Sequence, residues 1–250
     1  QLRRLDGALA RFFVGLDERL GAEAWAAMLS GDHGVATMPE ALEAQQVTAA
    51  CAREDAAAPR RSCALGERLS AETLREVVEA AARTALGQGE WIAGVSDPYV
   101  FYSREAEALA PERRTALDAA VVAALAEHPA IERALPSASI PRDCPDDPES
   151  LEALICEAFW PAGPGDVYFV LGPGSFVDPG LTPGKGSSHG TPYDYDRAVP
   201  LVVRAPGRVA AGVRIDAPVG FRAFARTAAS LLGIEPPEAA RLFPATFGEA

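Results

Sequence analysis

Two of the chain's three histidines lie in short glycine-containing segments whose residue types suit a metal site. Residues 30–34 read Ser-Gly-Asp-His-Gly and contain Asp32 and His33, and residues 187–191 read Ser-Ser-His-Gly-Thr and contain His189. Neutral imidazole and carboxylate are suitable zinc ligands, and zinc activates water or a side-chain oxygen in hydrolases near neutral pH. The two segments therefore indicate metal-assisted hydrolysis, although each one alone is also compatible with a polar turn.

The first segment can form a site only if its backbone turns. Asp32 and His33 are adjacent, so in an extended strand their side chains would point to opposite faces. In a turn at the end of a strand they can converge on one ion, and Gly34 lets the backbone pass close to that ion. An Asx-type turn without an ion is the alternative for this segment taken alone.

The second segment follows a glycine-rich loop that can place an imidazole freely. Lys185 in this loop can touch a phosphate, although a solvated loop lysine is the more common case. Ser187, Ser188 and Thr191 lie too close to His189 along the chain to form a nucleophile–base triad, and no Gly-x-Ser-x-Gly elbow occurs. We therefore expect these hydroxyl groups to order the loop.

The residues after the second segment are rich in tyrosine and aspartate. Tyr193, Asp194, Tyr195 and Asp196 either brace the His189 loop through hydrogen bonds or cap a turn.

Helices and strands alternate around these segments. The apolar spacing of residues 2–20 predicts an amphipathic helix packed on a core, and residues 24–29 predict a short buried strand that leads into the first histidine segment. Ligands in open α/β sheets gather outside the carboxyl ends of strands, so this position favours a site. Late strands are predicted at 166–171 and 199–203, separated by the long loop 172–190.

The middle of the chain predicts a lobe inserted into this framework. Residues 39–70 indicate an excursion from the sheet, and His128 is expected at a helix end with no ligand cluster nearby. Further elements are expected as helices over 70–85, 105–127, 148–159 and 221–232 and as strands over 91–102 and 131–140. We predict an α/β fold in which residues 1–250 form a single unit, with the lobe at approximately 39–160.

Composition limits the partners of this chain. Its 250 residues are 48% hydrophobic, enough for a packed core, and its formal net charge of −12 opposes binding to nucleic-acid polymers or anionic membranes. No apolar stretch reaches the length of a membrane span, and no targeting segment is expected in this chain. A small phosphate ester is compatible with the charge, because bound divalent cations would reverse the local potential.

The four cysteines fall into two near pairs, Cys51 with Cys63 and Cys144 with Cys156, in polar stretches that contain proline. Two local disulfides in an extracytoplasmic protein are favoured over four thiols in a cytosolic one, because buried inert cysteines usually sit in apolar runs.

Taken in order, these features resemble the C-terminal half of an alkaline phosphatase superfamily hydrolase. The relevant branches are the bacterial phosphomonoesterases and the type I phosphodiesterases and nucleotide pyrophosphatases. The matching features are residues 30–35, the glycine-rich loop into 189–191, the stretch 195–201 and a closing helix that ends at 231–234 before prolines. The resemblance is strong over 1–35 and 166–237 and weak between them, and it implies part of an α/β/α sandwich.

The resemblance also implies roles for particular residues. This family uses two zinc ions in phosphoryl transfer. Asp32 and His33 would bind the zinc that activates the nucleophile, and His189 would bind the zinc on the leaving-group side. Possible supporting residues are Gly34, Gly190, Thr191, Tyr193 and Asp194.

The family's other functional residues cannot be located in this chain. They are a Thr or Ser nucleophile, a metal-binding Asp and an Asp-x-x-x-His pair, which in the family lie upstream of the helix with which this chain opens. Because the chain opens at Gln1 directly in that helix, we expect a fragment or processed product whose partner is the missing N-terminal half. Alone it is expected to bind zinc weakly and to catalyse nothing.

The resemblance leaves several activities open. Residues 191–196 slightly favour a phosphomonoesterase, with a phosphodiesterase as the near alternative, and a sulfatase is possible on the same ground. A non-catalytic module that keeps the fold without the nucleophile is an alternative from another class.

Overall fold

The computed structural model describes residues 2–44, 66–160, 163, 165–178, 180 and 182–236. The chain splits into two compact units: unit 1 is Gln1–Asp32 with Val199–Ala250, and unit 2 is His33–Ala198. The lobe predicted at approximately 39–160 falls within unit 2, and the prediction of a single unit over 1–250 stays a prediction. The predicted pairing of Cys51 with Cys63 lies outside the described residues.

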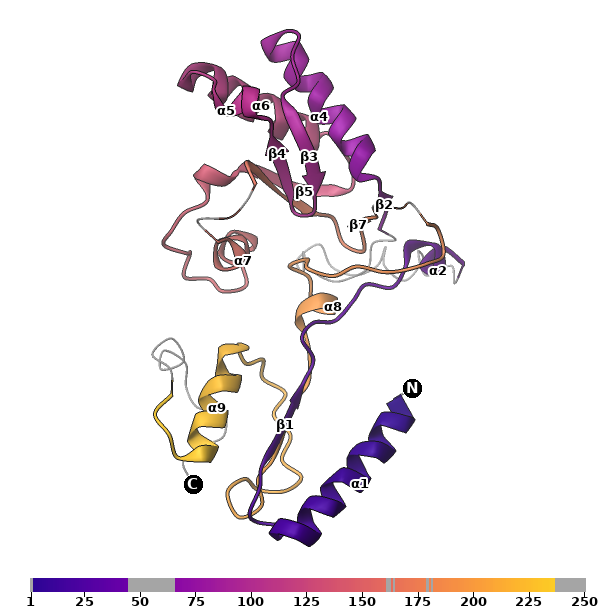
Figure 1. Cartoon of the computed structure of the whole chain (residues 1–250), viewed down its shortest axis with the longest axis vertical. Helices are drawn as coiled ribbons and strands as arrows, with labels where there is room; N and C mark the ends of the chain where they lie inside the picture. The colour runs from indigo at the N-terminus through magenta and orange to yellow at the C-terminus, as the bar shows by residue number, and fades with distance from the viewer. Residues whose placement is uncertain are drawn as a thin grey trace. The chain divides into compact units, whose positions relative to one another are not determined.

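Unit 2 is built on a four-stranded antiparallel sheet (Figure 1). Its strands, in spatial order, are β3 (Ile92–Ser96), β4 (Tyr99–Tyr102), β6 (Val167–Leu171) and β5 (Ile131–Pro136). The sequence of residues 91–102 is compatible with a bent strand or with paired strands. A turn containing the cis Asp97-Pro98 peptide joins β3 to β4, so the paired form is the one present.

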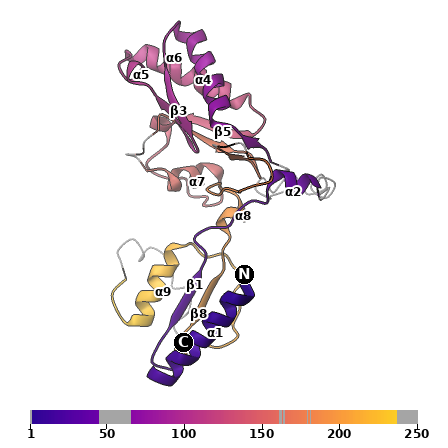
Figure 2. The same cartoon turned by 45° about the vertical axis from the view of Figure 1, so that its right-hand side comes forward.

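The central strand β6 is buried on both faces because helices cover each side of the sheet. Phe169 faces the larger core, which contains residues of α4 (Ala71–Leu86) and α6 (Pro111–Ala126). Tyr168, on the other face, packs in a smaller cluster with Ile155 of α7 (Leu151–Ala158). Alternate residues of a strand point to opposite faces, so β6 connects the layers of an α/β/α arrangement within unit 2 (Figure 2).

Helix α4 begins and ends where its sequence predicts. The Ser70 hydroxyl accepts a hydrogen bond from the Thr73 amide, and Gly87 follows the last turn with a φ of 88°.

The prediction of one continuous helix over 105–127 is wrong. Two helices are present, α5 (Arg104–Glu107) and α6, and Pro111 is the first residue of the second. A proline disfavours helical backbone at the residue before it, and Ala110 is extended at φ −61° and ψ 152°.

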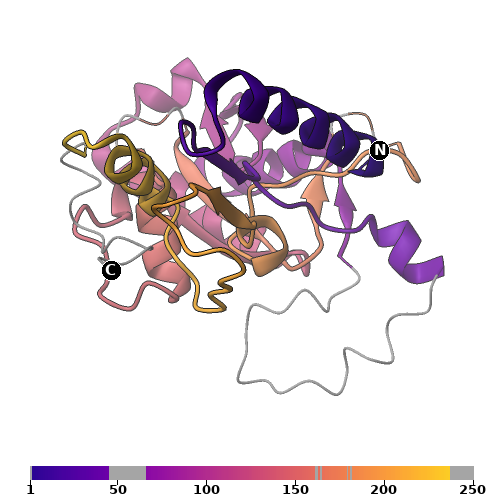
Figure 3. The same cartoon turned by 90° about the horizontal axis from the view of Figure 1, so that it is seen from below.

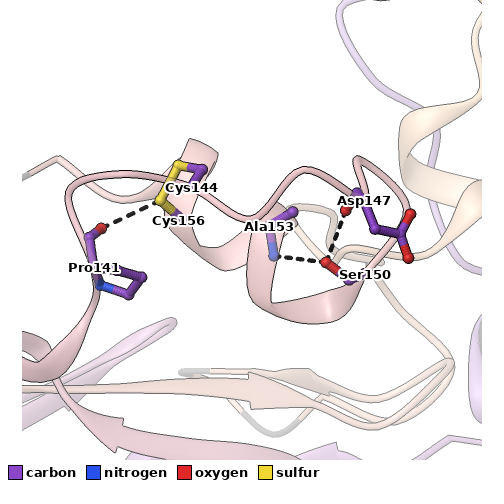
Figure 4. The surroundings of a disulfide bond; sticks show 6 residues. All are labelled: Pro141, Cys144, Asp147, Ser150, Ala153 and Cys156. Atoms are coloured by element: carbon purple, nitrogen blue, oxygen red, sulfur yellow. Dashed lines mark hydrogen bonds between the residues drawn. A yellow bond between two sulfur atoms is a disulfide. The ribbon is translucent and has the colours of Figure 1, made fainter.

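Helix α7 is tied to the preceding loop by a disulfide between Cys144 and Cys156 (Figure 4), which confirms that predicted pair. The Sγ atom of Cys156 also lies 3.2 Å from the carbonyl oxygen of Pro141. At the start of the helix the Ser150 hydroxyl donates to the Asp147 carbonyl and accepts from the Ala153 amide.

The long loop predicted over 172–190 contains a short strand. Strand β7 (Phe176–Val177) pairs in parallel with β2 (Arg68–Leu69). The remaining elements of unit 2 are α2 (Pro39–Ala44), the short 3₁₀ helix η1 (Ser137–Ser139) and α8 (Asp194–Arg197).

Unit 1 consists of α1 (Leu2–Leu20), β1 (Ala27–Ser30), β8 (Leu201–Arg204) and α9 (Arg222–Leu232). Strands β1 and β8 pair antiparallel, and α1 runs beside them (Figure 3). An ion pair of 3.0 Å between Arg204 and Asp17 and the contact of Phe13 with Trp25 hold α1 there.

Most of the large apolar residues of α1 are exposed, namely Leu2, Leu5, Phe12, Val14 and Leu20. The helix itself is confirmed, but it buries no residue, and Leu2 is 82% and Phe12 60% exposed. The predicted packing of this helix on a core is therefore wrong for this chain. Within the described residues, no helix is long and apolar enough to cross a membrane.

Candidate metal site

The two histidine segments meet in unit 2. The imidazole rings of His33 and His189 are stacked, with centroids 3.4 Å apart and planes inclined by 18°. The prediction named both residues as metal ligands, and the structure brings their side chains together although they lie far apart in the sequence.

Hydrogen bonds between the two segments hold the rings in this position. The Ser187 hydroxyl donates to the Ala36 carbonyl at 2.6 Å, and the Gly34 amide donates to the Asp196 carbonyl at 2.8 Å. A side chain at Gly34 would clash with the backbone carbonyl of Tyr195, so this close approach requires glycine.

The chain path explains why such distant segments can meet. Ser30 at the end of β1 is the cross-strand partner of Leu201 at the start of β8. The chain therefore leaves unit 1 and returns to it at the same end of one strand pair. Asp32 lies in the bend after β1 and directly precedes His33.

The ring of His33 has a defined tautomer. Its Nδ1 lies 2.8 Å from the Gly34 carbonyl oxygen, and a carbonyl can only accept, so Nδ1 carries the proton. The lone pair of the neutral ring is then on Nε2, which is the arrangement found in metal-binding histidines whose other nitrogen is anchored to the backbone.

Tyrosines anchor the second segment to the sheet of unit 2. The Tyr193 hydroxyl donates to the Leu171 carbonyl at the end of β6, and the Tyr195 hydroxyl accepts from the Gly174 amide, each at 2.9 Å. Burial raises the pKa of both phenols above the usual value, so both stay protonated and act as braces.

The other predicted supporting residues also lie in this segment. Gly190 has a φ of 103°, which favours glycine, and Thr191 donates two hydrogen bonds to Asp196. Asp194 begins α8, and its carbonyl accepts from the Ala198 amide.

Comparison with solved structures gives an independent view of this fold. The crystal structure of wild-type alkaline phosphatase PafA matches with a TM-score of 0.72 and 21% identity, over 95% of this chain and 40% of that one. A PafA variant with four substitutions matches with the same values. This chain has an alkaline-phosphatase-like fold.

The resemblance stated from the sequence is therefore confirmed at the level of the fold, and the α/β class with it. The chain spans about 40% of the length of the structures that it matches. No protein-family profile matches the chain. No curated protein matches it either.

Within the described residues, no group of three or more His, Cys, Asp or Glu side chains is placed to hold an ion. Zinc sites use three or four ligands, so the two imidazoles have suitable donor chemistry but do not complete a site. His128 lies apart, after α6, and its Nδ1 accepts from the Ala130 amide at 3.2 Å, as expected for a helix-end residue.

A shallow pocket of about 220 Å³ lies beside the second segment. It is lined by Arg68, Asp178, Lys185 and Ser187 among others, and the Arg68 guanidinium is paired with Glu40 and Asp178.

Sequence reasoning missed two contacts that join the segments. They are the bond from Ser187 to Ala36 and the bond from Gly34 to Asp196. Neither has a local sequence signal, because each joins residues that only the fold brings together.

Proposed function

We propose that this chain is the C-terminal part of a zinc-dependent phosphoric ester hydrolase and that a phosphomonoesterase is its activity. Asp32, His33 and His189 would be the metal ligands that this C-terminal part supplies, and the substrate would be a small phosphate ester. The observation that carries this proposal is the stacked pair of His33 and His189 on an alkaline-phosphatase-like fold.

By the resemblance, each imidazole would serve a different one of two ions, which two-metal hydrolases hold about 3.5–4 Å apart. The stacked rings bring these two candidate ligands together. Zinc, when bound, would supply positive charge for the oxygens of the transferring phosphoryl group. This chain's contribution is to orient the rings: the Gly34 carbonyl fixes the tautomer of His33, and the bonds around Thr191 hold the loop of His189.

The remaining ligands and the nucleophile would come from another part of the same protein. Exposed apolar residues of unit 1 support this proposal: Leu29 and Val202 are cross-strand partners, yet they are 51% and 54% exposed. Apolar surface of this kind on paired strands commonly marks a packing face. In a longer protein that carries the missing half, we expect slower amide exchange in β1 and α1 than in this chain; equal exchange would contradict the proposal.

The activity test uses that longer protein with a chromogenic phosphate monoester and a diester. We expect faster hydrolysis of the monoester. His33→Ala and His189→Ala should each lower kcat/KM by more than about 100-fold, because loss of outer-shell partners alone costs about 10–100-fold. The matched control is His128→Ala, which should leave activity unchanged. Full activity in both site variants would overturn the assignment.

A non-catalytic module is the alternative that the incomplete ligand set favours. It predicts no hydrolysis of either ester and no zinc in the longer protein. The net charge of −12 favours a small substrate over a nucleic-acid polymer. We further propose an extracytoplasmic location, because the disulfide between Cys144 and Cys156 suits an oxidising compartment.

A further inference from the structure

Asp196 in α8 is bonded to both histidine segments. Its backbone carbonyl accepts from the amide of Gly34, the residue after His33. Its carboxylate oxygen Oδ2 accepts from the amide of Thr191 at 2.8 Å and from the Thr191 hydroxyl at 2.7 Å, two residues after His189. Asp196 is thus bonded both to the segment that contains His33 and to the segment that contains His189.

The local backbone does not require these bonds. Helix α8 has only four residues, and its first turn is closed by the backbone bonds from Asp196 and Arg197 to the Tyr193 carbonyl. A capping side chain accepts from amides that follow it in the helix. The Asp196 carboxylate instead reaches back to a residue before the helix.

The position of Asp196 carries a cost that folding alone does not explain. The residue is 4% exposed, and its second carboxylate oxygen, Oδ1, is buried and accepts no hydrogen bond within the described residues. Burying a carboxylate oxygen without a donor is unfavourable. Such violations are expected where position serves function.

Helix α8, which contains Asp196, is itself anchored to the sheet of unit 2. Tyr193, at the start of α8, is buried and bonded to the Leu171 carbonyl at the end of β6. The Asp196 amide donates to the Tyr193 carbonyl at 3.0 Å. Movement of either histidine segment is therefore opposed by a path of bonds that ends in the central strand.

We propose that Asp196 is a positioning residue that holds His33 and His189 in the stacked arrangement. Its carboxylate fixes the loop of His189 through Thr191, while its carbonyl fixes the segment of His33 through Gly34. The proposal depends on the proposed function only for the role of the two rings as metal ligands. The geometric claim can be tested without metal or substrate.

The test is the nuclear Overhauser effect between the carbon-bound ring protons of His33 and His189, recorded on the 250-residue chain. With three histidines in the chain, the ring signals can be assigned by single substitutions. The wild-type chain should give a strong ring-to-ring effect. Asp196→Ala should abolish it, whereas Asp196→Asn should retain it, because the amide oxygen can still accept both Thr191 bonds.

The His128 signals and the unfolding midpoint separate positioning from general damage. In Asp196→Ala, both should stay at their wild-type values while the ring-to-ring effect is lost. If Asp196→Ala does not fold, the pair Thr191→Val and Thr191→Ser decides: the first should weaken the effect by half or more, and the second should preserve it.

An unchanged effect in a folded Asp196→Ala chain, or equal effects in the two Thr191 variants, would overturn the proposal. So would the absence of the effect from the wild-type chain. Failure of the proposed function would give a different result. The longer protein would then lack zinc or activity, while the ring-to-ring effects in the Asp196 and Thr191 variants would still be those expected above.

Discussion

The two units differ in how far they bury their apolar side chains. In unit 2, Phe169 and Leu117 are fully buried between the sheet and its helices. In unit 1, α1 buries no residue, and Leu29 and Val202 stay about half exposed on the paired strands. Burial of apolar surface is the dominant favourable term in folding, so the described part of unit 2 gains more of this stabilisation than that of unit 1.

Two of the candidate ligands lie in the unit with the larger buried core. His33 and His189 both belong to unit 2, and the bonds that hold them end in its sheet. The stacked pair should therefore depend on the core of unit 2 and tolerate changes in unit 1.

The largest expected effect comes from the core of unit 2. Phe169→Ala should lower the free energy of unfolding by about 3–5 kcal/mol, because a buried phenyl ring is lost and a cavity is left. Urea denaturation measures this change. A loss below about 0.5 kcal/mol, the size expected for surface positions, would contradict the claim that unit 2 is stabilised by its own core.

A buried carboxylate should give the next effect. Glu79 of α4 accepts hydrogen bonds from the amides of Trp91 and Ile92 and pairs with Arg83 at 2.8 Å. Glu79→Ala should cost about 2–3 kcal/mol, since buried amides lose their acceptor. Glu79→Gln keeps an acceptor and should cost less. Equal urea midpoints for the two variants would show that the Trp91 and Ile92 amides do not need a side-chain acceptor at position 79.

An ion cluster in unit 2 should give a smaller, pH-dependent effect. The hydrogen bond from Arg68 is the main cause that lowers the pKa of Glu40 to about 2. Backbone amides of Thr182 and Gly180, and then Arg68, lower the pKa of Asp178 to about 2. Because both values lie below the unfolded values of about 4, this stabilisation is complete above pH 4 and is lost as the pH falls towards 2.

Arg68→Met tests this cluster through the urea midpoint measured between pH 6 and pH 2. The wild-type midpoint should fall below pH 4. The variant should start lower and fall less, because the pKa of Glu40 returns towards its usual value. Parallel curves for the two chains would show that Arg68 does not cause the dependence.

The smallest effect is expected in unit 1. Phe12→Ala should change the stability of this chain by less than about 0.5 kcal/mol, as at other exposed positions. In a longer protein that carries the N-terminal part proposed above, the same change should cost more, because we propose that the ring is covered there. Equal costs in the two proteins, measured by urea denaturation, would remove the contrast between the units.

Local signals made several elements predictable. The caps at Ser70 and Gly87 bound α4 as expected, and the apolar run of β6 is a buried strand. The alanine-rich composition of residues 105–127 favours one continuous helix, and Pro111 is the local signal of the break. The antiparallel pairing of β1 with β8 joins distant residues, and no local pattern encodes such a partner.

The candidate site was predictable only in its residue types. Asp32, His33 and His189 stand out because zinc chemistry needs carboxylate and imidazole. Their relation depends on contacts such as Ser187 with Ala36, which arise only in the folded chain. Asp196 was visible as a possible brace, but its bond to Gly34 was not.

The proposed role of His33 and His189 as zinc ligands is tested most directly by the zinc content of the proposed longer protein and its variants, measured by elemental analysis after removal of loosely bound metal. We expect two zinc ions per wild-type chain and per His128→Ala chain, and about one fewer in His33→Ala and in His189→Ala. Two zinc ions retained in both site variants would show that neither histidine binds zinc.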